Sequence, residues 1–78
     1  MKTMTCKELG GACDIKIQAA SFGEMNELSM QHSMEMMQQN DKAHIKAIQN
    51  MKEIMQNPMM MNEWFAMKKA EFDALPED

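Results

Sequence analysis

The stretch MTCKELGGACDIKIQAASFGE, residues 4–24, decides the fold class. Its apolar side chains alternate with polar ones on both sides of a Gly-Gly pair, which is typical of two short strands joined by a tight turn. We therefore expect a β-hairpin over residues 1–20. Because an isolated two-stranded hairpin is barely stable in water, one of its faces should pack on helices. The alternating apolar positions are Met4, Cys6, Ile15, Ile17 and Ala19.

Three capping signals divide the rest of the chain into helices. Ser21 followed by Glu24 is a capping box, and Asp41 is a residue type that favours the N-cap. Asn57 followed by Pro58 predicts a third start, because proline is tolerated in the first helical turn. The three predicted helices span residues 21–39, 41–56 and 58–75.

The chain has 78 residues, so we expect a single α+β domain over residues 1–78 with the order β-β-α-α-α. At roughly 1.5 kcal/mol of ordering entropy per residue, folding needs on the order of 4,500 Å² of apolar burial to break even. A monomer of this size is therefore marginal, and self-association is expected.

The net charge of −4 and the absence of arginine argue against nucleic acid as a partner, since phosphate binding needs clustered basic side chains. The eight lysines are dispersed, which also argues against an anionic membrane surface. The sequence contains no apolar run of about 18 residues, so no transmembrane helix is predicted. It also shows no apolar segment like that of a signal peptide. We expect a cytoplasmic protein.

Thirteen methionines are the compositional anomaly. On the first predicted helix, Met30, Met34 and Met37 form an apolar face beside the one that carries Met25 and His32, so the apolar arc is too wide for one core. Methionine pairs at helical spacing could bind Cu(I), but core or interface packing explains them better. We expect a homo-oligomer that associates through the Met30, Met34 and Met37 face.

Cys6 and Cys13 are the candidate reactive residues, and in the cytoplasm both should be thiols. A hairpin turn centred between Leu9 and Gly10 would place them opposite each other, whereas a turn centred on Gly10-Gly11 would offset them by two positions. With a helix histidine they could form a site for Zn(II) or Cu(I). Two other interpretations stay open: small buried apolar side chains, or a reversible thiol switch.

The run Cys6-Lys7-Glu8-Leu9-Gly10-Gly11-Ala12-Cys13-Asp14, followed by a strand and a capped helix, resembles the domain of unknown function family numbered 1059. The resemblance covers about the first forty residues, and the two later helices look like an extension. It implies a compact α+β unit in which Cys6, Cys13 and His32 lie together, with no assigned activity. Many shorter relatives carry a second histidine five residues after the first, where this chain has Met37.

No catalytic arrangement emerges from the remaining residues, because the acidic side chains lie on solvent faces or at helix starts. His44 lies on an apolar helix face and is interpreted as a hydrogen-bonded core histidine rather than a ligand. We therefore expect that the protein is not an enzyme and needs no cofactor, and that it is a self-associating interaction module. The alternatives are a Zn(II) or Cu(I) domain that uses Cys6, Cys13 and His32, with Met36 or Met37 as further donors, and a thiol redox switch.

Overall fold

The structure is a computed structural model that describes all 78 residues. It contains two strands followed by three helices, which confirms the predicted α+β fold and the order β-β-α-α-α. A single 3-10 turn lies between the strands. The elements are β1 (Lys2–Thr5), the 3-10 turn (Lys7–Leu9), β2 (Lys16–Ala19), α1 (Phe22–Gln38), α2 (Lys42–Gln56) and α3 (Pro58–Ala74).

The two strands pair antiparallel, with Thr5 opposite Lys16, so their register is centred on the Gly-Gly pair. The predicted tight turn is wrong, because residues 6–15 form a longer loop between the strands. Leu9 is buried inside this loop, and Gly10 ends the 3-10 turn at a φ of 92°, which favours glycine. Ile15 was expected to alternate with the buried positions, but it lies in the loop and is 49% exposed.

All three predicted helix caps are present. Each cap side chain accepts backbone N–H groups from the first turn, which satisfies donors that have no partner inside the helix. None of the three helices is long and apolar enough to cross a membrane. The Ser21 side chain accepts from the Glu24 N–H, and the Asp41 side chain accepts from the His44 N–H. The Asn57 side chain accepts from the N–H groups of Met59 and Met60.

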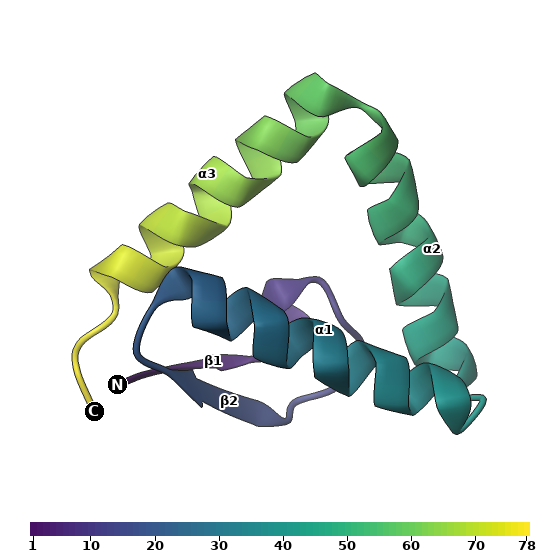
Figure 1. Cartoon of the computed structure of the whole chain (residues 1–78), viewed down its shortest axis with the longest axis horizontal. Coiled ribbons are helices and arrows are strands. Elements are labelled where there is room, and N and C mark those ends of the chain that lie inside the picture. The colour runs from purple at the N-terminus through teal and green to yellow at the C-terminus, as the bar shows by residue number, and fades with distance from the viewer.

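The three helices are arranged as the sides of a triangle, and the hairpin lies beside α1 (Figure 1). The molecule is flat, with extents of 34 × 29 × 15 Å. The C-terminal end of α3 returns to the hairpin, where the Lys2 ammonium donates to the backbone carbonyl of Phe72 at 3.1 Å. The small core lies at this corner and consists of Met4, Leu9, Ile17, Ala19, Met25 and Phe72.

Candidate metal centre

Four potential metal ligands meet where the hairpin loop, α1 and α2 come together. Cys6 follows β1 directly, Cys13 lies later in the same loop, His32 lies on α1, and His44 lies near the start of α2. One sulfur or nitrogen atom from each residue lies within 4.8 Å of the other three. The cluster therefore joins three elements that are separate in the sequence.

The backbone of the loop sets the position of both cysteines. The Cys6 N–H donates to the Ile15 carbonyl at 2.9 Å, and the Lys7 N–H donates to the Cys13 carbonyl at 2.9 Å. Gly11 packs so closely that an added Cβ would overlap Cys6 Sγ and would lie 3.0 Å from the Cys6 carbonyl oxygen. A glycine is thus required here for steric reasons, since any side chain would displace the Cys6 sulfur.

Each histidine faces one cysteine. His32 Nε2 lies 3.2 Å from Cys13 Sγ, and His44 Nε2 lies 3.7 Å from Cys6 Sγ. In a tetrahedral site with ordinary Zn–S and Zn–N bond lengths, a sulfur and a nitrogen ligand are about 3.6 Å apart. Both observed distances are close to that value, whereas the whole set of four atoms spreads over up to 4.8 Å, so the atoms would draw closer together around an ion.

Asp41 supports His44 from the side away from the cysteines. His44 is only 4% exposed, and its Nδ1 is the buried side-chain nitrogen that makes no hydrogen bond of good geometry. The nearest acceptor is Asp41 Oδ1, at 3.1 Å from Nδ1. A carboxylate in this position favours a proton on Nδ1, which leaves the Nε2 lone pair directed at the cluster.

The surroundings shift the pKa values of three groups in the cluster. Burial raises the pKa of the Cys6 thiol. Burial also acts to raise the pKa of Cys13, but hydrogen bonds from the Ile15 backbone and from His32, His44 and Cys6 outweigh it and lower the pKa to about 7. Burial acts to lower the pKa of His44, but the Asp41 carboxylate and Cys13 outweigh it and raise it. The site thus favours a thiolate at Cys13, the form that a metal cation binds, whereas protonated His44 would have to release the proton on Nε2 to become a ligand.

The structure brings together all three residues that the sequence singled out as ligands, Cys6, Cys13 and His32. His44 is buried, as expected, but its interpretation as a core histidine missed its place in the cluster. The resemblance pointed to a second histidine at the position of Met37, which instead is 47% exposed and lines a groove between the helices. The fourth donor comes from α2.

No family model, no curated protein and no solved structure matches the chain. The resemblance to the family numbered 1059 therefore stays a prediction. The chemistry of the cluster is argued from its own geometry.

Proposed function

We propose that the protein binds one Zn(II) ion through Cys6, Cys13, His32 and His44. The observation that carries the proposal is the convergence of two thiols and two imidazoles. One donor atom from each lies within 4.8 Å of the others, and two sulfur–nitrogen distances, 3.2 and 3.7 Å, are close to those of tetrahedral coordination. Two sulfur and two nitrogen ligands are a common donor set of structural zinc sites. Hard cations such as Mg²⁺ or Ca²⁺ prefer oxygen ligands, which this cluster does not supply.

Zn(II) fits the cluster better than Cu(I), the other metal expected from the sequence. Cu(I) is favoured by soft thiolate and thioether ligands, and Met37 would be the thioether of choice. Its side chain, however, lines the groove and is half exposed. Two imidazoles and a supporting carboxylate at Asp41 are more typical of zinc.

The proposed role of the ion is structural rather than catalytic. Four protein ligands fill a tetrahedral site and leave no position for a reacting water or substrate. Bound there, the ion would connect the hairpin loop to α1 and α2, and its binding energy would add to that of a small apolar core of six residues. We further propose that this non-enzymatic role belongs to the cytoplasm, where both cysteines stay reduced.

A thiol switch is the second candidate function, favoured by the Cys13 pKa of about 7 beside a neighbouring thiol. Oxidised glutathione would accept two electrons and two protons from Cys6 and Cys13, giving one disulfide and two reduced glutathione molecules. A bound Zn(II) ion would block this reaction, because both sulfurs would be ligands. The two functions therefore make opposite predictions for thiol reactivity in protein saturated with zinc.

The test is metal titration of the reduced protein. Native mass spectrometry reports the bound mass, and the visible bands of Co(II) substituted for Zn(II) report tetrahedral geometry with thiolate ligands. The variants C6S, C13S, H32A and H44A each remove one donor. Asp14→Asn is the matched control, because it changes an exposed carboxylate next to Cys13 that lies outside the cluster.

We expect one ion per chain with a tetrahedral cobalt spectrum, weakened in all four ligand variants and unchanged in the control. Alkylation of Cys13, which is partly exposed and has the lowered pKa, should be fast without metal and blocked with zinc, whereas the buried Cys6 should react slowly in both states. Full reactivity of Cys13 in zinc-saturated protein would exclude the metal site. A disulfide whose potential lies near that of the glutathione pool would then support the thiol switch.

A further inference from the structure

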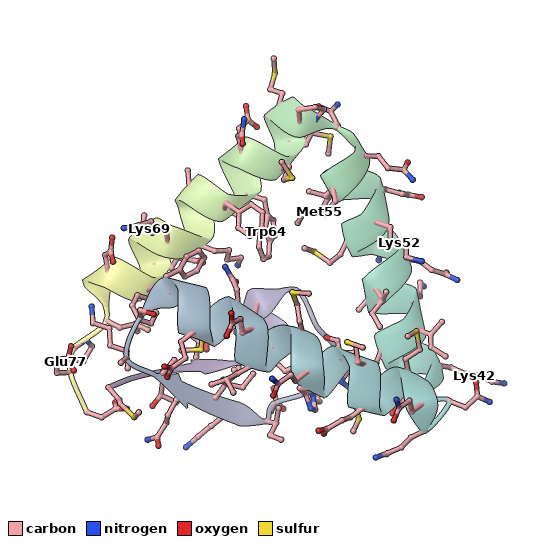
Figure 2. All side chains as sticks on the ribbon, in the orientation of Figure 1. Lys42, Lys52, Met55, Trp64, Lys69 and Glu77 are labelled. Carbon is pink, nitrogen blue, oxygen red and sulfur yellow. The ribbon has the colours of Figure 1, made fainter.

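The space enclosed by the three helices is a groove lined with apolar side chains. It has a volume of about 670 Å³, and its lining includes His44 and residues 9–11 of the hairpin loop. Figure 2 shows Met55 and Trp64 pointing into this space, whereas Lys42 points away from it. The apolar lining includes Met30, Met34 and Met37 from α1, Met51 and Met55 from α2, and Trp64 from α3.

The chain exposes more surface than a folded monomer of its mass. A monomer of 9.0 kDa is expected to expose about 4,900 Å², whereas this chain exposes 5354 Å². The excess of about 500 Å² is more than half of the 800 Å² or so that one partner contributes to a stable protein interface. The flat shape and the open groove account for this excess.

Part of the exposed apolar surface faces outward from the groove rather than into it. Met30 is 65% exposed and Met34 is 55% exposed, although both line the groove. A small molecule inside the groove would leave these outer methionine surfaces in water. A second protein surface would cover them together with the groove, and methionine and aromatic side chains are enriched at the centres of such interfaces.

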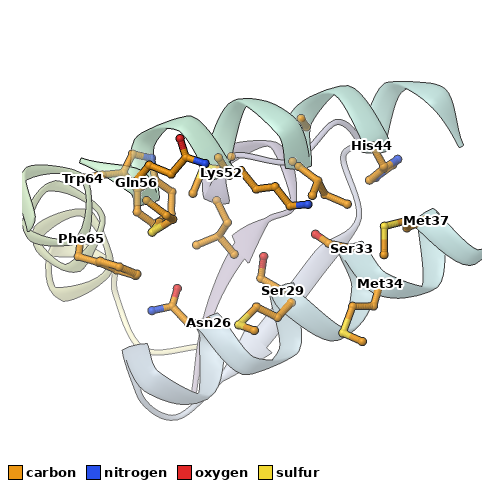
Figure 3. Close-up of a pocket in the computed structure, with 18 residues that line it drawn as sticks. Asn26, Ser29, Ser33, Met34, Met37, His44, Lys52, Gln56, Trp64 and Phe65 are labelled. Atoms are coloured by element: carbon orange, nitrogen blue, oxygen red, sulfur yellow. The ribbon is translucent and has the colours of Figure 1, made fainter. Parts of the chain in front are cut away.

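The net charges of α1 and α2 suggest which surface that is. As a whole helix, α1 carries three glutamates and no lysine, whereas α2 carries three lysines and one glutamate; of these charged residues, Lys52 is the one that lines the groove. Lys52 lines the groove on the α2 side and extends toward α1 in Figure 3, where Ser29 and Ser33 face it. A twofold axis would place the acidic α1 of each copy against the basic α2 of the other. The same pairing of opposite charges would then occur twice in the interface.

We propose that a second copy of this chain covers the groove and forms a twofold homodimer, with α1 of each copy against α2 of the other. The methionine lining supplies adaptable apolar contacts at the centre, and Lys52 of each copy would face the acidic α1 of the other. The proposal rests on the groove and not on the metal site, so it stands or falls independently of zinc binding.

The test is sedimentation velocity and native mass spectrometry at micromolar concentration, with zinc present. Met34→Lys places a positive charge on α1 against the basic α2 of the other copy, at a position that is exposed in the monomer, so the fold of the single chain should tolerate it. Met59→Lys is the matched control, because Met59 is 72% exposed and does not line the groove. Far-UV circular dichroism confirms that both variants fold.

We expect a species of twice the 9.0 kDa chain mass for the original sequence and for M59K. For M34K the dissociation constant should rise by about tenfold or more, because the new ammonium group would lose its water on association and face the lysines of the other copy's α2. A monomer at all concentrations overturns the proposal, as does an assembly of another size or equal weakening by both variants. A monomer that carries a small apolar molecule, seen as added mass under native conditions only, would show that the groove is a ligand pocket instead.

Discussion

Gly11→Ala tests whether the cluster binds metal, because it displaces one ligand without removing any. The new Cβ would overlap Cys6 Sγ, so the sulfur has to leave its position. The nearest alternative is another χ1 rotamer of Cys6, which moves the sulfur on the order of 3 Å. Metal–ligand distances tolerate changes of about 0.2 Å, so Cys6 can no longer be a ligand.

The size of the effect follows from the binding energy of a structural zinc site. Such sites contribute about 10–16 kcal/mol, which is about 2.5–4 kcal/mol for each of four ligands. Loss of the Cys6 sulfur should therefore raise the dissociation constant for Zn(II) roughly 100- to 1,000-fold. The added methyl group also lies 3.0 Å from the Cys6 carbonyl oxygen, so some loss of stability is expected without metal as well.

The assay is competition for Zn(II) against a chromophoric chelator, together with urea unfolding of the metal-free protein. Gly23→Ala is the control, because a Cβ at Gly23 meets nothing within 4 Å. A second control adds Gly11→Ala to Cys6→Ala, where no sulfur remains to be displaced and zinc affinity should fall no further. The reasoning is refuted if Gly11→Ala alone binds Zn(II) within threefold of the original protein while Cys6→Ala binds it far more weakly.

Two further substitutions test the support of the site and the core. Asp41→Asn keeps a residue type that caps α2 but removes the charge 3.1 Å from His44 Nδ1, so the dissociation constant for Zn(II) should rise about 10- to 100-fold in the same competition assay. Unchanged affinity would show that this carboxylate does not support the ligand. Phe72→Ala removes a ring that is 4% exposed and packs on Phe22, and it should lower the free energy of unfolding by about 3–5 kcal/mol in urea titrations. A loss below about 1 kcal/mol would contradict the placement of the core at the junction of α3 and the hairpin.

The elements of this fold were predictable because their signals are local. Ser21, Asp41 and Asn57 each cap a helix through bonds to residues two or three positions later, and such patterns are readable in the sequence. The sequence leaves the strand register open between two turn centres, and the structure has the one on Gly10-Gly11, which offsets Cys6 and Cys13 by two positions. The loop between the strands was not predictable, because its form depends on the burial of Leu9 against the rest of the core.

The candidate metal cluster was predictable in part, because local sequence signals reach only some of its members. Cys6 and Cys13 are close in sequence. His44 approaches them only because of the angle at which α2 leaves α1. That angle is a tertiary property, and a histidine on an apolar face is typical of a core residue as well as of a ligand. One available signal was that His32 and His44 lie on either side of the short turn at Asn40, a residue with a positive φ of 60°.

The four ligand atoms all belong to the first 44 residues, and α3 contributes none of them. α3 is held instead by Phe72 in the core and by the bonds from Lys2 to its last carbonyls. With Zn(II) bound as proposed, the molecule would have two separate attachments: coordination at the four-residue cluster, and apolar packing with hydrogen bonds at α3. α3 can therefore open as a local cooperative unit while the loop, α1 and the start of α2 stay joined, so its amide hydrogens should exchange before those around the cysteines.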